Sequence, residues 1–175
     1  GGKELNLVPL HTWPKPYSVH LRGADFKPGR PESAQRHAGD SSRREELRYI
    51  CSRTIDTRDD YDNEYWLIAG DFNARSRNDN FHYRWPADTA AFWAHDFLLE
   101  ETSMVDVISE IHPGEFHRSH SNMRRIDFVY ASKAMYGCIS DARIIDDEVV
   151  APVKDTLVPM FFNPSDHLPI VVDFK

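Results

Sequence analysis

The chain has 175 residues, of which 41% are hydrophobic and 12% aromatic, and 21 Lys and Arg against 28 Asp and Glu leave a formal net charge of −7. This length corresponds to one domain over residues 1–175, and the apolar fraction excludes a disordered, collagen-like or coiled-coil chain. The apolar runs are too short to cross a bilayer, so no membrane span is expected. The acidic balance disfavours a generic nucleic-acid coat but leaves room for a local basic patch.

The first half of the chain predicts a strand, a loop, a helix and a second strand. Residues 5–10 form the expected strand, and residues 12–40 hold four prolines among glycine and charged residues, which predicts a long irregular loop. A capping-box pattern followed by apolar residues at helical spacing predicts a helix over 42–57. The apolar run 65–69 ends in Gly-Asp at position 71, which is typical of a buried strand entering a loop.

The second half predicts one more helix and three more strands. The helix is expected over 88–98, with Asp88 as its N-cap and with Phe92, Trp93 and Phe97 on one face. Strands are expected over 126–131, 138–145 and 168–174. This order of elements favours a mixed α/β sandwich over a pure parallel sheet.

Polar residues stand at strand ends that this topology brings to one rim. The first two strands each end in a polar residue, and the helix between them makes the strands parallel neighbours. The strand over 126–131 and the last strand instead have polar residues at their beginnings, so they share that rim only if they run in the opposite direction. The group gathered there comprises His11, Asp71, Asn73, Asp127, Asp166 and His167. Carboxylates and imidazoles in one cluster are suited to metal-assisted phosphoryl or acyl hydrolysis.

Each part of this group also has a purely structural interpretation. Residues 71–73 are compatible with an Asx-turn that closes a strand. Residues 166–167 are compatible with a turn that carries a capped histidine, and Asp127 with a charge at a sheet edge. Three such motifs in this order nevertheless favour a shared site.

Three ordered motifs resemble those of the endonuclease/exonuclease/phosphatase superfamily, which has the DNase I-like fold. They are Gly70-Asp71-Phe72-Asn73, Arg125-Ile126-Asp127-Phe128-Val129-Tyr130 and Ser165-Asp166-His167-Leu168-Pro169-Ile170. The resemblance implies an α/β (α+β) fold in which two mixed β-sheets form a sandwich flanked by helices, in four layers (α/β/β/α). It also implies Mg²⁺-dependent hydrolysis of a phosphorylated substrate by in-line attack of water, with Mn²⁺ as the alternative ion.

The resemblance further implies a role for each residue of the group. Asp71 looks like the residue that orients or deprotonates the attacking water, and Asn73 would position that water and the scissile phosphate. His167 would donate a hydrogen bond to a non-bridging oxygen, while Asp127 fixes its tautomer and favours its charged form. Asp166 would bind the metal, together with Asp71.

Two further residues are assigned to the substrate phosphate. His11 would contact it from the opposite wall of the site, as the resemblance implies. Arg125 stands at the start of the second motif, close in sequence to Asp127, and would bind phosphate through its forked donors. A solvated surface position is the open alternative for Arg125, as it is for the nearby arginines 75, 77 and 124.

The resemblance covers the C-terminal two-thirds of the superfamily domain. Family members begin with two strand regions ahead of the stretch corresponding to residues 5–11, and those regions carry the principal metal-binding Glu. We therefore expect an N-terminally truncated domain that binds Mg²⁺ weakly and shows little hydrolysis by itself. We also expect it to associate with its missing N-terminal segment or with a second copy, because sheet edge and apolar surface would be exposed.

Two functions from different classes follow from these residues. The first is a Mg²⁺-dependent phosphoester hydrolase: a phosphodiesterase, nuclease or phosphatase acting on nucleic acid or a small phosphoester. The second is a catalytically incomplete remnant that binds phosphorylated ligands or a partner. The lack of a continuous Lys/Arg stripe disfavours an enzyme that tracks along DNA. The sequence predicts no localisation.

A second group of histidines lies outside these motifs. His112, His117 and His120 flank Glu115 in an expected loop, which leaves a zinc site or solvated loop residues as interpretations. Their spacing differs from that of a zinc-protease helix and favours solvated residues. The two cysteines, Cys51 and Cys138, are too few for a disulfide framework and are expected to be buried thiols.

Overall fold

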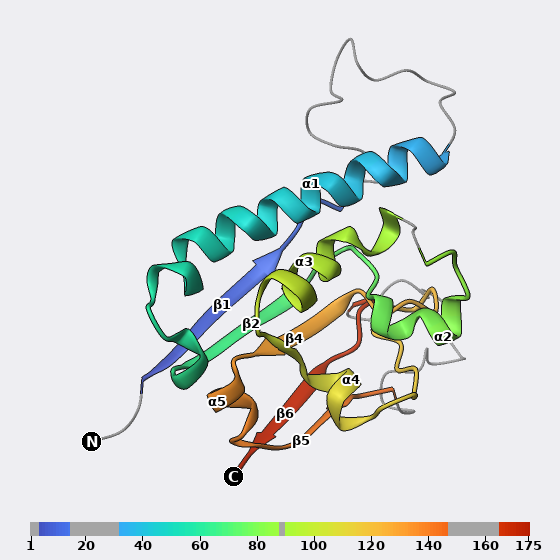
Figure 1. The fold of residues 1–175 in the computed structure, drawn as a ribbon. Coiled ribbons are helices and arrows are strands. Elements are labelled where there is room, and N and C mark those ends of the chain that lie inside the picture. The colour runs from blue at the N-terminus through green and yellow to red at the C-terminus, as the bar shows by residue number, and fades with distance from the viewer. Residues whose placement is uncertain (1–3, 15–31, 88–89, 147–164) are drawn as a thin grey trace.

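The computed structural model describes residues 4–14, 32–87, 90–146 and 165–175, and Figure 1 shows how they are arranged. Two β-sheets and several helices form the α+β architecture expected from the sequence. No helix within these ranges is long and apolar enough to cross a membrane. The predicted cap at Asp88 lies outside the described residues.

The larger sheet has four strands in the order β1-β2-β4-β3. These strands are β1 (Leu5–His11), β2 (Tyr65–Asp71), β4 (Asp127–Ala131) and β3 (Val105–Asp106). β1 and β2 are parallel, with His11 opposite Asp71, whereas β2 and β4 are antiparallel, with Asp71 opposite Asp127. The opposed direction that the sequence required of the strand over 126–131 is therefore confirmed, and three polar residues meet at one end of the sheet. The last strand, which the sequence also placed at this rim, belongs to the smaller sheet.

The smaller sheet pairs β5 (Ile139–Ile144) with β6 (Ile170–Phe174) in an antiparallel ladder. All the expected strands are present, with ends that differ by one or two residues. Cys138 lies just ahead of β5 and is half-buried, whereas Cys51 is fully buried as expected.

Successive side chains of β2 point to opposite faces of the larger sheet, and a hydrophobic core lies on each face. Trp66 and Ile68 pack with α1 (Glu32–Arg53) and α3 (Trp93–Glu101), which lie together in Figure 1. Leu67 points the other way and packs with residues of α4 (Val107–Ile111) and the smaller sheet. Because β2 is buried on both faces, it reads in the sequence as a continuous apolar run.

The first helix, α1, begins ten residues earlier than predicted, so the irregular loop expected over 12–40 is wrong from residue 32 onward. Ser42 lies inside the helix and is buried, so its capping-box pattern does not mark the start. Two buried contacts of Arg43 hold the helix across its predicted start: Arg43 donates to Asp40 one turn earlier at 2.7 Å and to the carbonyl oxygen of the distant Trp13 at 2.9 Å. The helix ends at Arg53, and a 3₁₀ turn over Ile55–Thr57 follows.

The second predicted helix is also displaced. A 3₁₀ turn over Ala90–Phe92 leads into α3, so the regular helix starts later and continues to Glu101. Phe92 and Phe97 are buried as expected, but Trp93 is exposed, which corrects its placement on the apolar face. Three short helices were not predicted: α2 (Asn80–Tyr83), α5 (Lys133–Tyr136) and α4. They are only four or five residues long, which is too short to show a helical periodicity.

Candidate active site

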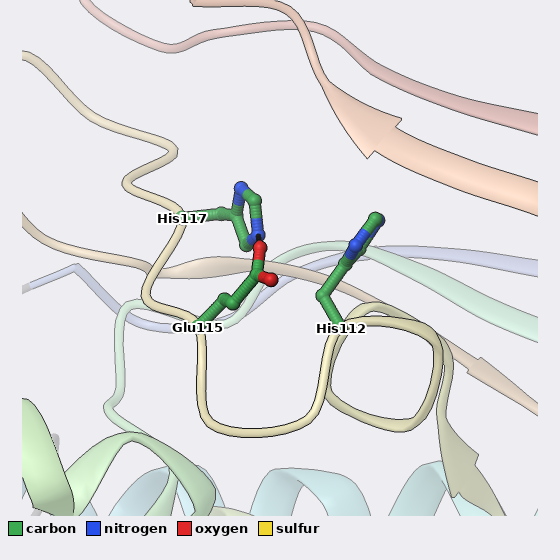
Figure 2. A group of neighbouring side chains, drawn as sticks. All are labelled: His112, Glu115 and His117. Atoms are coloured by element: carbon green, nitrogen blue, oxygen red, sulfur yellow. Dashed lines mark ion pairs between the residues drawn. The ribbon is translucent and has the colours of Figure 1, made fainter.

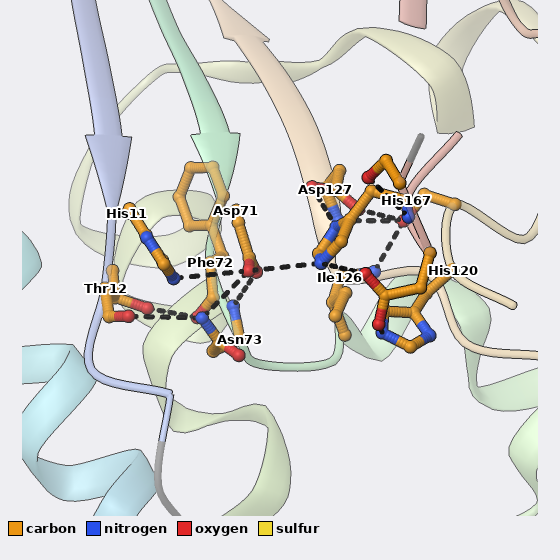
Figure 3. A network of polar contacts seen from close by, with 12 residues as sticks. His11, Thr12, Asp71, Phe72, Asn73, His120, Ile126, Asp127 and His167 are labelled. Atoms are coloured by element: carbon orange, nitrogen blue, oxygen red, sulfur yellow. Dashed lines mark hydrogen bonds and ion pairs between the residues drawn. The ribbon is translucent and has the colours of Figure 1, made fainter. Parts of the chain in front are cut away.

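The polar residues at the carboxyl ends of β1 and β2 face those at the start of β4 and just ahead of β6 (Figure 3). Asp71 lies at the centre of this arrangement. Its Oδ2 atom is 3.5 Å from His11 Nε2 and 3.8 Å from His167 Nε2. The structure thus brings together the residues that the sequence placed on one rim, and the strand directions account for their meeting.

The end of β2 is held by a tight turn over residues 71–73. The Asn73 backbone N–H donates to Asp71 Oδ1 at 2.7 Å, and the Asn73 amide donates to Asp71 Oδ2 at 3.0 Å and to the Thr12 carbonyl at 3.1 Å. Asn73 has φ +47°, a left-handed conformation that asparagine tolerates. The Asx-turn interpretation is therefore correct as geometry, and this turn fixes the orientation of the Asp71 carboxylate.

Gly70 permits the close contact of β1 and β2 just before Asp71. It has φ +145°, and a Cβ atom there would lie 1.9 Å from the carbonyl oxygen of Leu10. Any other residue would push the two strands apart at the site. Burial raises the pKa of Asp71, and the hydrogen bond from Asn73 only partly opposes that effect.

Asp127 holds His167 through its Nδ1 atom. The two Asp127 carboxylate oxygens lie 3.0 and 2.9 Å from Nδ1. Ser119 fixes the carboxylate in turn: its hydroxyl donates to Asp127 Oδ2 at 2.7 Å and accepts the Asp127 backbone N–H at 2.9 Å. Partial burial disfavours the charged imidazole, but the hydrogen bond and charge of Asp127, helped by Asp71 and Asp166, outweigh it and raise the pKa of His167.

The other ring nitrogen of His167 faces the open side of the site. His167 Nε2 is 3.8 Å from Asp71 and 3.9 Å from Asp166 Oδ1, so neither carboxylate is within hydrogen-bonding distance. Asp166 is 68% exposed and His11 is exposed as well. A proton on Nε2 therefore points into a solvent-open space between two carboxylates.

His120 belongs to this site, although the sequence grouped it with His112 and His117. Its Nδ1 atom accepts the Asn122 backbone N–H at 3.1 Å, so its Nε2 atom carries the proton and donates to Asp166 Oδ2 at 3.1 Å. The rings of His120 and His167 lie 4.7 Å apart, edge to face. Sequence reasoning missed both Ser119 and His120, because their contacts come from a bridge between distant segments and leave no local pattern.

The structure corrects the assignment of Arg125 to the substrate phosphate. This side chain is only 1% exposed, and its guanidinium donates to Asp79 at 2.9 Å, to Asp106 at 2.7 Å and to Ser109 at 2.7 Å. With its donors satisfied in the interior, Arg125 is not available to a substrate. Among the neighbouring arginines, Arg124 is exposed, while Arg77 pairs with Asp96 at 2.7 Å.

Comparison with solved structures identifies the fold. The chain is similar to an AP endonuclease from Archaeoglobus fulgidus, with a TM-score of 0.59 and 18% sequence identity over 96% of this chain and 60% of that one. It is also similar to a 3′-5′ exonuclease from Neisseria meningitidis, with a TM-score of 0.52 and 20% identity over 83% of this chain and 56% of that one. A 3′ phosphatase from Neisseria, bound to a product DNA hairpin, matches with a TM-score of 0.52 and 18% identity over 84% of this chain and 56% of that one.

These similarities show that the chain has the fold of these proteins, the DNase I-like fold. The three solved neighbours named above are nucleases or phosphatases, and the chain spans 56–60% of their length. No family model matches the sequence, and no curated protein matches it either.

Proposed function

We propose that the rim residues form part of the active site of a divalent-cation-dependent phosphoester hydrolase. The observation that carries this proposal is the arrangement around His167: Nδ1 is tied to Asp127 at 2.9 Å, while Nε2 faces the space between Asp71 and Asp166. A fold shared with nucleases and phosphatases supports the same reaction class. The substrate is a phosphoester of a nucleic acid or of a small molecule.

In this proposal each side chain has a distinct task. Asp71, whose carboxylate is oriented by the turn over residues 71–73, accepts a proton from the attacking water. His167, kept protonated by Asp127, donates from Nε2 to a non-bridging phosphate oxygen and stabilises the charge that develops there. Asn73 uses both amide protons to hold Asp71 and Thr12, so it acts as a positioning residue within the turn. His11 contacts the phosphate from the β1 side.

The donor set suits Mg²⁺, or Mn²⁺ in its place, because such hard cations take carboxylate oxygens and keep several waters. Asp166 and Asp71 are the residues that would hold the ion, and both face the side of His167 that is open to solvent. When bound, the cation supplies positive charge near the substrate phosphate. His120 is then a positioning residue, because it orients the Asp166 carboxylate through a 3.1 Å contact.

Hydrolysis of bis(p-nitrophenyl) phosphate at saturating Mg²⁺ tests the proposal. We expect little turnover from the 175-residue chain and clear turnover from a form extended upstream. In the active form, Asp71→Asn and His167→Gln should each abolish most activity, whereas Asp59→Asn, at an exposed carboxylate outside the site, should not. Full activity of Asp71→Asn in either form would overturn the proposal.

Association with further polypeptide is a second proposal, and exposed apolar residues of β1 support it. Leu5 and Leu7 pair with Tyr65 and Leu67 of β2 and so lie on the sheet face that packs toward β5 and β6, yet both are exposed. An uncovered apolar strand at a sheet edge favours pairing with other chains. Light scattering should report the mass of a dimer, and Leu7→Lys should return it to that of one chain. A monomer at high concentration would exclude a second copy as the partner and leave the hydrolase proposal untouched.

A further inference from the structure

Three side chains that follow α4 converge at a second place, away from the rim. His112 directly follows the helix, and the turn that comes next brings Glu115 and His117 to the same side of the loop (Figure 2). Gly114, with φ +78°, allows the chain to reverse between them. One ligand atom from each of the three residues lies within 4.8 Å of the others. The reversal of the chain therefore brings these three side chains together, although their spacing in the sequence is not that of ligands on one helix.

His112 is oriented by a backbone contact. Its Nε2 atom lies 2.8 Å from the carbonyl oxygen of Ala142 in β5. A carbonyl only accepts, so Nε2 carries the proton and the lone pair of the ring is on Nδ1. Histidines that bind metal ions commonly donate their second N–H to a backbone carbonyl in this way, which fixes the tautomer that leaves the other nitrogen free to bind.

His117 presents an unsatisfied nitrogen to the same group. Its Nε2 atom is buried, has no hydrogen-bond partner among the described residues, and lies 3.4 Å from a carboxylate oxygen of Glu115. Leaving a buried polar atom without a partner costs free energy, which a bound cation would recover. Glu115 itself is 67% exposed, so its carboxylate can move toward an ion without disturbing the core.

We propose that His112, Glu115 and His117 bind a Zn²⁺ ion. Two imidazoles and one carboxylate form a ligand set that Zn²⁺ accepts, whereas Mg²⁺ prefers oxygen ligands alone. Water completes the coordination on the exposed side of the loop. This site is separate from the rim, and the proposal does not rest on the proposed function.

The bound ion would cross-link the loop to β5. His112 already connects the end of α4 to Ala142, and the ion would add Glu115 and His117 to that connection. The chain then runs directly into Ser119 and His120, which contact Asp127 and Asp166 of the rim. Zn²⁺ would therefore stabilise the fold and steady the segment that leads to the candidate active site.

Zn²⁺ titration by calorimetry, with the histidine ring resonances followed by NMR, tests this proposal on the full chain. We expect a Zn²⁺ ion that persists in millimolar Mg²⁺, shifts the His112 and His117 resonances first and raises the melting temperature. His117→Gln should weaken binding at least tenfold and remove the thermal shift. Because His117 makes no hydrogen bond to the rest of the described fold, this variant should melt like the parent without metal.

Two control variants separate this site from other histidines. His82→Phe, which removes an exposed imidazole outside the group but keeps a ring against Phe116, should bind Zn²⁺ like the parent. The double variant Asp71→Asn/His167→Gln removes the rim cluster and should also retain the loop site. No Zn²⁺ binding at micromolar concentrations, or binding lost in the rim variant but kept in His117→Gln, would overturn the proposal.

Discussion

Two polar networks flank the start of β4 only two residues apart, and they differ in how completely their charges are paired. Arg125 is fully buried, and its guanidinium donates to Asp79 and Asp106. Asp127 is half-buried and holds His167, whose Nε2 atom stays open to solvent. The same pairing of carboxylate and cation thus serves the interior in one place and leaves a proton donor for a ligand in the other. The two networks use similar residue types. They differ in whether every hydrogen-bond donor of the cation already has a partner inside the protein, and only the network with an open donor is a candidate site.

Two histidines repeat this contrast. His95 is fully buried, with Nδ1 accepting the Tyr130 hydroxyl at 2.7 Å and Nε2 donating to the Ala74 carbonyl at 3.3 Å, and burial lowers its pKa to about 3. His167 is partly exposed beside carboxylates that raise its pKa. The interior therefore favours a neutral imidazole and the rim favours a charged one, as desolvation and nearby charge dictate.

The largest effect is expected from Arg125→Met, which leaves Asp79 and Asp106 buried without their cation. Breaking a buried ion pair in this way costs about 3–5 kcal/mol of unfolding free energy. Urea denaturation measures it, with Arg124→Met at the exposed neighbour as the control, where a change within about 0.5 kcal/mol is expected. If the Arg125→Met variant were stable but had lost phosphate binding, Arg125 would contact the substrate after all. The contrast between a structural and a functional network would then be wrong.

The second effect is a loss of stability in mild acid through His95. Below about pH 6.5 an unfolded histidine binds a proton, whereas folded His95 stays neutral down to about 3, so the unfolded state binds more protons. The free energy of unfolding should then fall by about 1.4 kcal/mol for each pH unit below 6.5. Urea denaturation between pH 7 and 5 measures the slope. His95→Gln should flatten it and His82→Gln should not; equal slopes in the two variants would exclude His95 as the cause.

A third effect concerns the link from His120 to Asp166. His120→Ala removes the donor that orients this exposed carboxylate, so in the active form the Mg²⁺ concentration for half-maximal turnover should rise roughly tenfold. The maximal rate at saturating Mg²⁺ should change little, and a general loss of folding would instead lower that rate. His120→Gln, which retains an N–H donor, should recover part of the Mg²⁺ affinity. An unchanged Mg²⁺ dependence would remove His120 from the site.

The smallest effect is a shift of one titration. Asp127→Asn should lower the pKa of His167, because it removes the hydrogen-bonded charge that opposes desolvation. Since a raised folded pKa stabilises the protein at acid pH and this gain is lost as pH rises through that pKa, the variant should lose stability on the acid side. NMR titration of the ring measures the shift, and Asp166→Asn, 3.9 Å away, should shift it less. A larger shift in Asp166→Asn would reverse the roles of the two carboxylates.

The sequence by itself determined five of the six strands of the described residues and the polar residues at their ends, whereas the two-residue strand β3 was not predicted. Apolar runs and turn residues are local signals, so β1, β2 and β4 were predicted within a residue or two. The requirement for opposed strands also followed from the sequence, because Asp71 ends its strand and Asp127 begins one. Local patterns were less reliable for α1, where buried contacts of Arg43 extend the helix past the apparent cap.

Only the tertiary structure decided which polar side chains face solvent and which face one another. Arg125 and Asp127 belong to the same short motif, but their partners differ. Arg125 is buried against Asp79 and Asp106. Asp127 stays at the rim, where it contacts Ser119 and His167. His120 contacts Asp166 and does not group with His117, because a β-bridge to residue 167 positions the backbone of His120. Whether a charged side chain is buried and paired or open to solvent depends on partners from distant segments and on the water that those segments exclude. The residues next to it in the sequence determine neither.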